Sequence, residues 1–164
     1  MVRNEKGFTL IELMVVVLII GILVAIAVPS FLGARTRAQD RAAQSNLRTA
    51  LAAAKTYYSD NQIFPQTVQD FEDVEPSLQY TLIGTDGQLT PDNVASASNV
   101  SFDVLGSGAE DANKGIALGM HSNSGKDYAI LEVAVGTVDG QVPGTYYAVD
   151  DDGAGTNFTW GNSW

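Results

Sequence analysis

The sequence predicts an α+β protein in which one long N-terminal helix packs on a C-terminal antiparallel β-sheet. Three observations predict this fold class. A nearly unbroken apolar run extends from Phe8 to Leu32, and a helical apolar pattern resumes behind it to about residue 60. From residue 78 onward, apolar and polar residues alternate with period two between Asp-Gly and Ser-Gly turns.

Charge and composition divide the chain and exclude several kinds of site. Residues 1–59 carry seven basic and three acidic residues, whereas residues 60–164 carry two lysines and sixteen acidic residues. The second part therefore has a net charge of −14, which repels phosphate backbones, and we predict no nucleic-acid partner. The absence of Cys and the single His exclude disulfides, thiolate metal sites and multi-His metal sites within one chain.

The apolar run is long enough to cross a membrane as a helix. Only Thr9, Glu12 and Ser30 interrupt it with polar side chains. About 20 helical residues cross the hydrocarbon layer of a bilayer. Arg3 and Lys6 precede the run, so the positive-inside rule favours an N-terminus on the cytoplasmic side. Three arginines that follow the run, at positions 35, 37 and 41, oppose that orientation.

Three interpretations of this run compete. It is a secretory signal peptide with an A-x-A cleavage pattern ending at Ala27, a plain signal anchor, or a segment whose leader is removed before the apolar run. The stretch Gly7-Phe8-Thr9-Leu10-Ile11-Glu12 resembles the processing site of type IV prepilins. That resemblance implies cleavage after Gly7 by a prepilin peptidase and N-methylation of Phe8. Residues 1–7 would then be the leader, and residues 8–32 the membrane-spanning and filament-core half of the helix.

Glu12 needs an explanation, because a carboxylate within a membrane span is unfavourable. A signal peptide or a plain anchor gains nothing from it, and a location in the headgroup zone is the plainer alternative. After cleavage the free α-amino group of Phe8 becomes available as a partner, four residues away. The resemblance implies that Glu12 of one subunit pairs with Phe8 of its neighbour during assembly.

The second half of the helix, residues 33–60, reads as amphipathic. Pro29 should kink or locally melt the helix before it. One stripe should then pack on the sheet, and a second stripe is basic and reads as a solvated face or a subunit contact. The first stripe comprises Ala43, Leu47, Ala50, Leu51, Ala54 and Tyr58, and the second comprises Arg37, Arg41, Arg48 and Lys55. Nucleic-acid binding by the basic stripe is disfavoured, since acidic surface surrounds it.

Residues 61–164 are predicted to form an acidic head built on an antiparallel sheet of four to six short strands. Residues 66–76 read as a loop. The strand candidates centre on residues 78–82, 100–104, 116–120, 129–135 and 145–149, with a last candidate at Phe158 and Trp160. Many pilins fix this region with a disulfide, which this chain lacks, so Trp160 and Trp164 are candidates to anchor the tail.

No constellation of residues supports catalysis. The sequence has no phosphate-binding glycine loop and no G-x-S-x-G, and His121 reads as a surface residue. The segment 150–157 is acidic and glycine-containing, and it departs from an EF-hand loop. Asp150, Asp152 and Asn157 are therefore weak candidates for a Ca²⁺ site, and no other cofactor is expected.

The resemblance implies a non-enzymatic structural subunit of a type IV pilus. The precursor would be a single-pass protein of the cytoplasmic membrane in contact with lipid, and the product an extracellular helical filament of identical subunits. Its partners would be the prepilin peptidase and the assembly platform with its ATPase. A type II secretion pseudopilin is the alternative, and a secreted binding domain released after Ala27 is a third interpretation.

Overall fold

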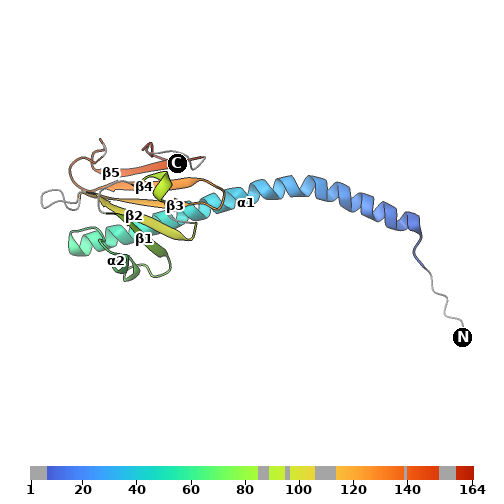
Figure 1. Ribbon diagram of the computed structural model, residues 1–164, viewed down its shortest axis with the longest axis horizontal. Helices are drawn as coiled ribbons and strands as arrows, with labels where there is room; N and C mark the ends of the chain where they lie inside the picture. Colours follow the sequence, from blue (N-terminus) through green and yellow to red (C-terminus); the bar gives the residue numbers. More distant parts are fainter. Residues whose placement is uncertain (1–6, 85–88, 95–96, 106–113, 139, 152–157) are drawn as a thin grey trace, which may run out of the picture. The chain divides into compact units, whose positions relative to one another are not determined.

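The computed structural model describes residues 7–84, 89–94, 97–105, 114–138, 140–151 and 158–164. The chain divides into two compact units, Met1–Arg37 and Ala38–Trp164, and helix α1 (Leu10–Asn61) contributes residues to both (Figure 1). The second unit also contains helix α2 (Val68–Glu72), the 3₁₀ helix η1 (Pro91–Asn93) and a five-stranded sheet. The strands are β1 (Gln79–Gly84), β2 (Asn99–Leu105), β3 (Gly115–His121), β4 (Asp127–Val133) and β5 (Gly144–Asp150). The α+β fold class is thus confirmed.

Helix α1 is continuous through Pro29, so the predicted local melting does not occur. A proline inside a helix removes one backbone hydrogen bond, and the apolar residues around it are good enough helix formers to continue the helix. The helix ends at Asn61, as expected, because Gln62 takes a left-handed conformation with φ of 60°. Its N–H donates to the carbonyl of Tyr58 at 2.8 Å, which closes the last turn.

The strands follow one another in the sheet in the order β1-β2-β3-β4-β5. The pairs β2–β3, β3–β4 and β4–β5 are antiparallel, as predicted. The β1–β2 pair is parallel, with Gln79 opposite Asn99, and here the prediction of an antiparallel sheet was wrong. Fourteen residues separate these two strands, which is long enough for the crossover that parallel pairing requires.

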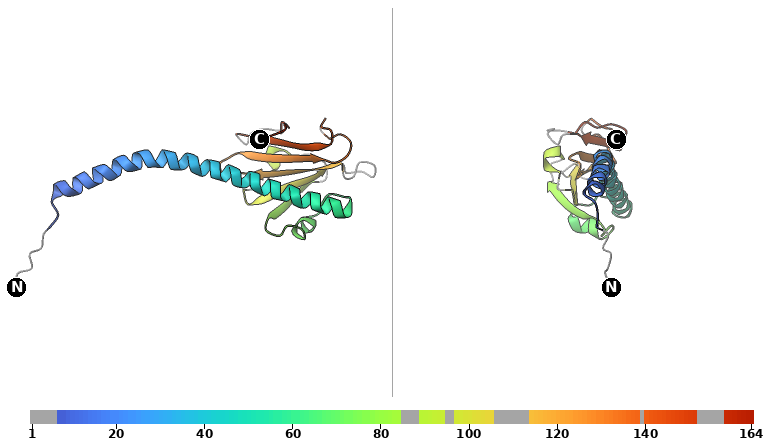
Figure 2. Two further views of the ribbon diagram at one scale, coloured as in Figure 1. Left: turned by 180° about the vertical axis from the view of Figure 1, so that it is seen from behind. Right: turned by 90° about the vertical axis from the view of Figure 1, so that its right-hand side faces the viewer.

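The helix covers one face of the sheet and shorter segments cover the other (Figure 2). The predicted helix stripe is buried against alternate strand residues such as Phe102, Ile116 and Leu118, each with 0% exposure. On the opposite face, Leu89 and Val94 lie over Gly119, where an added Cβ would approach Val94 Cγ2 to 2.8 Å. We expected one covered face, and the second covered face explains why most residues of β2, β3 and β4 are buried.

Two further parts of the head differ from expectation. The stretch expected to be a loop contains α2, which opens with a capping box between Thr67 and Asp70. The last predicted strand, at Phe158 and Trp160, is not a strand, and this segment instead joins the sheet through one bridge between Tyr147 and Gly161. The segment is held by packing rather than by a regular ladder.

Candidate functional site

Thr9 and Glu12 form a capping box at the start of α1. The Thr9 N–H donates to Glu12 Oε2 at 2.9 Å, and the Thr9 hydroxyl donates to the same oxygen at 2.7 Å. In return the Glu12 N–H donates to Thr9 Oγ1 at 3.3 Å. This reciprocal arrangement satisfies N–H groups that a helix start otherwise leaves without partners. The spacing Thr-x-x-Glu before an apolar run is a known signature of the motif, and the sequence analysis missed it.

The cap places the predicted processing site outside the helix. Gly7 and Phe8 precede the first helical residue, Leu10, and Phe8 is 88% exposed. An atom added at the Cα of Gly7 would meet nothing within 4 Å among the described residues. The peptide bond between Gly7 and Phe8 is therefore open to an enzyme that needs an extended segment of backbone. Both hydrogen bonds from Thr9 end on Oε2 of Glu12, and among the described residues no hydrogen bond to Oε1 is found.

The side chains of the apolar half of α1 are exposed. An 18-residue window of this helix is apolar enough to cross a membrane, and none of that window is buried within the molecule. Ile11, Phe31 and Ile26, for example, are each 70% exposed or more. In water such a surface is strongly unfavourable, so this segment needs lipid or other apolar helices around it.

Two residues of the basic stripe of α1 make contacts with other side chains of the head. Lys55 Nζ lies 2.9 Å from Glu132 Oε1 and donates to Thr145 Oγ1 at 3.3 Å. The guanidinium of Arg48 lies over the ring of Trp164, 4.8 Å from its centroid. Arg37 and Arg41 are exposed and take part in no ion pair among the described residues. Half of the predicted contact stripe is thus used within the head.

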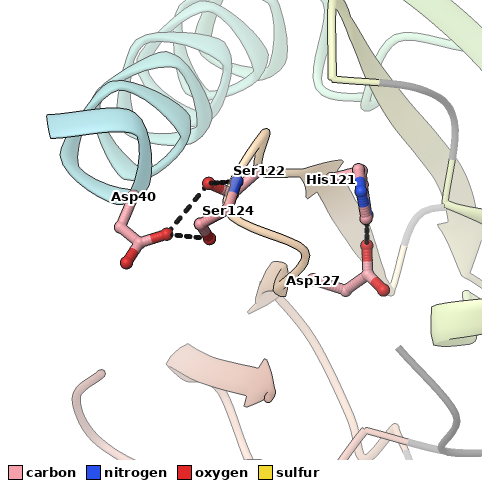
Figure 3. Close-up of polar contacts among 5 residues, drawn as sticks. All are labelled: Asp40, His121, Ser122, Ser124 and Asp127. Atoms are coloured by element: carbon pink, nitrogen blue, oxygen red, sulfur yellow. Dashed lines mark hydrogen bonds and ion pairs between the residues drawn. The ribbon is translucent and has the colours of Figure 1, made fainter. Parts of the chain in front are cut away.

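The turn between β3 and β4 carries a group of polar side-chain contacts (Figure 3). Asp40 of α1 accepts hydrogen bonds from the hydroxyls of Ser122, at 2.9 Å, and of Ser124. His121 Nδ1 lies 2.8 Å from Asp127 Oδ1 on the neighbouring strand. Burial raises the pKa of Asp127, and the hydrogen bond to His121 opposes that rise only in part.

These residues do not assemble a catalytic triad. Figure 3 shows that His121 points toward Asp127, while Ser122 and Ser124 turn toward Asp40. Adjacent strand residues face opposite sides of a sheet, which separates His121 from Ser122. The serine hydroxyls donate to Asp40 and not to the imidazole of His121, so the Ser-His-Asp order of a triad is not formed. The hydrogen bonds to Asp40 fasten the helix to the turn.

The predicted Ca²⁺ candidates fall mostly outside the described residues. Asp150 ends β5, whereas Asp152 and Asn157 lie outside the part of the chain that the structure describes. Within the described ranges, no group of three or more His, Asp and Glu side chains is placed to hold a metal ion. The Ca²⁺ site stays a prediction.

Comparisons with known proteins point to one family. Residues 2–28 match the model of the prokaryotic N-terminal methylation motif. The chain is 36% identical over 107 residues to the type IV wide pilus major component PilA4 of Thermus thermophilus, an alignment that covers 65% of this chain and 69% of that protein.

Two other relatives align with this chain over a smaller part of their length. The type IV major pilin protein PilA of Myxococcus xanthus is 49% identical over 57 residues, which cover 35% of this chain and 26% of that protein. The type II secretion system core protein G of Pseudomonas aeruginosa is 41% identical over 70 residues, which cover 43% of this chain and 49% of that protein. This chain therefore spans half or less of the length of these two relatives.

Proposed function

Because the chain belongs to the type IV pilin family, we propose that it is the structural subunit of a type IV pilus. One observation carries the proposal. A single carboxylate, Glu12, opens an apolar helix half with no burial inside the molecule, directly behind an exposed Gly7-Phe8 peptide. An apolar surface of this extent, with one charged group near its start, suits a helix that leaves lipid to bundle with copies of itself.

Processing sets up the assembly contact. Prepilin peptidase cuts after Gly7, and the new amino group is methylated at Phe8. In the filament, Glu12 Oε1 of one subunit accepts a hydrogen bond from the Phe8 amine of its neighbour, while Oε2 stays with Thr9 of its own chain. The carboxylate thereby stabilises two helix starts, and an opposite charge offsets its cost in the apolar bundle.

The precursor waits in the cytoplasmic membrane with its N-terminus inside, and an assembly platform with an ATPase extracts it into an extracellular filament. Pro29 stays at the end of the bundled segment. The exposed guanidinium groups of Arg37 and Arg41 then contact carboxylates of neighbouring heads, whose region carries a net charge of −14. Arg48 and Lys55 contribute less to that contact, because Trp164 and Glu132 already engage them.

The intact mass and N-terminal sequence of the protein from its native cells test the proposal. We expect a chain that begins at N-methylated Phe8, isolated from sheared surface filaments. A chain that begins at Val28 would instead identify the apolar run as a disposable signal peptide. A chain that begins at Met1 in cells with an active prepilin peptidase would identify a plain anchor, and either result overturns the proposal.

The similarity to core protein G favours a second candidate, a pseudopilin of a type II secretion system. That candidate goes with Ca²⁺ bound by Asp150, Asp152 and Asn157 and with the absence of long surface filaments. Thermal unfolding of the head with Ca²⁺ and with a chelator separates the two functions. A rise in Tm on addition of Ca²⁺ supports the pseudopilin if Asp152→Asn abolishes that rise. A Tm that Ca²⁺ leaves unchanged supports the pilus subunit.

A further inference from the structure

Two arginines stand directly behind the apolar half of α1 without a carboxylate partner. Arg35 and Arg37 are exposed, and neither belongs to an ion pair among the described residues. The next carboxylate along the chain is Asp40, whose Oδ1 is occupied by the hydroxyls of Ser122 and Ser124. The two guanidinium groups are therefore available to an anionic ligand.

The side chain of Arg37 turns back toward the apolar run. Its Nη1 lies 3.5 Å from the position that a Cβ on Gly33 would take, so the guanidinium rests over that glycine, one turn nearer the N-terminus. Side chains in a helix lean toward its N-terminus, which here is the direction of the apolar segment. Because Arg37 follows the span, this lean brings its guanidinium back toward the polar layer of a bilayer, where long cationic side chains keep their charged ends.

The depth of these residues matches that layer. At about 1.5 Å per residue, the helix from Leu10 to Leu32 is about 34 Å long, enough to cross a hydrocarbon core of about 30 Å with some tilt. Arg35 and Arg37 then lie about 5 Å and 8 Å beyond Leu32, and the headgroup zone on each side is about 5–8 Å thick. Phosphate oxygens are the anions found at this depth, and a guanidinium binds them in a bidentate manner.

We propose that Arg35 and Arg37, which lie two residues apart and so point to different sides of α1, each bind the phosphate of an anionic phospholipid headgroup. The inference rests on the membrane-anchored precursor proposed above and adds the ligand and the residues that hold it. The site attracts the end of the span to the headgroups, and this attraction opposes the repulsion between an anionic bilayer surface and the acidic residues 60–164. The positive-inside rule disfavours basic residues on the outer side of a span, and a lipid-binding role gives a reason for Arg35 and Arg37 to stand there.

Native mass spectrometry of the full-length chain tests this site. The protein in detergent micelles is mixed with equal amounts of phosphatidylglycerol and phosphatidylcholine that carry the same acyl chains, and the retained lipids are counted. We expect the wild type to retain phosphatidylglycerol preferentially. Each of R35Q and R37Q should weaken that retention about fivefold, as one basic residue near an anionic surface does.

A matched pair of double variants controls for net charge. R35Q/R37Q and R41Q/R48Q each remove two positive charges from the same helix, and glutamine preserves helix propensity. The first should lose the preference for phosphatidylglycerol, and the second should keep most of it. An equal loss in both would show a general charge effect and would overturn the site, as would no preference in the wild type.

Two other results are informative about partners. If R35Q/R37Q keeps its lipid preference but yields fewer filaments, the arginines bind a neighbouring subunit and the lipid site is wrong. A wild-type chain that fails to enter vesicles of phosphatidylcholine and phosphatidylglycerol would contradict the membrane-anchored precursor itself. Entry into these vesicles without a headgroup preference would contradict only the lipid site.

Discussion

One oxygen of Glu12 caps its own helix, and we propose that the other accepts a hydrogen bond from a neighbouring subunit. Oε2 accepts from Thr9 of the same chain, and this bond caps the helix. Oε1 is the oxygen assigned above to the neighbouring amine. A substitution at Thr9 disturbs only the first role, whereas a substitution at Glu12 disturbs both.

The variants Thr9→Ala and Glu12→Gln should therefore differ in filament yield. Thr9→Ala loses a cap of about 1 kcal/mol, and filaments should still form in reduced amount. Glu12→Gln loses the charge that attracts the neighbouring amine, so the chain should be cleaved after Gly7 and stay in the membrane. Quantification of sheared filaments, with N-terminal sequencing of the membrane fraction, checks both variants. Normal filaments from Glu12→Gln would contradict the pairing.

Asp70 makes the stability of the head depend on acid pH. Burial alone would raise the pKa of this carboxyl, but hydrogen bonds from the N–H groups of Gln66 and Thr67 and from the hydroxyls of Thr67 and Tyr57 lower it overall. A lowered pKa in the folded state means that Asp70 stabilises the head above its unfolded pKa. That stabilisation is lost as the pH falls through the folded value.

We accordingly expect Asp70→Ala to lower the free energy of unfolding by about 1–2 kcal/mol at pH 7, since it removes the side chain that accepts hydrogen bonds from the N–H groups of Gln66 and Thr67 before α2. The difference from wild type should shrink as the pH falls below the ordinary range of an aspartate. Urea unfolding at a series of pH values measures this. Asp73→Ala, at the other end of α2, serves as the control, and a difference that grows toward acid pH would refute the prediction.

At the scale of elements, Trp164 anchors the end of the tail segment 158–164. The indole N–H of Trp164 donates to the carbonyls of Ala148, at 2.9 Å, and of Ala129, at 3.3 Å. The rings of Tyr128 and Tyr147 meet it edge to face, and Arg48 lies over it. The anchoring role expected of Trp164 is confirmed by these contacts. Trp160 packs with Phe158 on the opposite face of the sheet.

Trp164→Ala should destabilise the head by about 2–4 kcal/mol, because it removes a half-buried aromatic residue and its hydrogen bonds from the face that carries α1. Trp160→Ala removes the same chemical group from the other face and should cost less, about 1–2 kcal/mol. Thermal and urea unfolding of the two variants provide the comparison. The prediction fails if Trp160→Ala is the more damaging of the two.

The elements show what the sequence could and could not predict. Alternating runs located the strands, and helical periodicity located the buried stripe, since both patterns are local. The parallel pairing of β1 with β2 depends on how the connection between them crosses the sheet, which no local pattern encodes. Helix α2 was missed although Thr67 and Asp70 have the spacing of a capping box, as do Thr9 and Glu12. The ion pair between Lys55 and Glu132 joins residues far apart in sequence, so it could be found only once the fold was known.

At the scale of the whole molecule, the two units place opposite demands on their surroundings. All buried apolar residues of the described chain lie in Ala38–Trp164, beginning with Ala43, while the side chains of the apolar half of α1 are exposed. The core of residues 38–164 therefore contains no residue of the apolar half of α1.

A fragment of residues 38–164 should accordingly fold alone, as a monomer with one cooperative unfolding transition. The full-length chain should require detergent or lipid to stay in solution. Size-exclusion chromatography and circular dichroism of both forms check these expectations. A fragment that aggregates or melts without cooperativity would show that the apolar half also supports the head.

The non-covalent attachment of segment 158–164 has a consequence for where and how the protein matures. A head without cysteine needs no oxidant, no disulfide isomerase and no particular glutathione poise to reach its native state. Reducing agents that open disulfide-fastened domains leave this one unchanged. A contact made by Trp164 also re-forms spontaneously after it is broken, so a subunit deformed by mechanical load recovers without any enzyme.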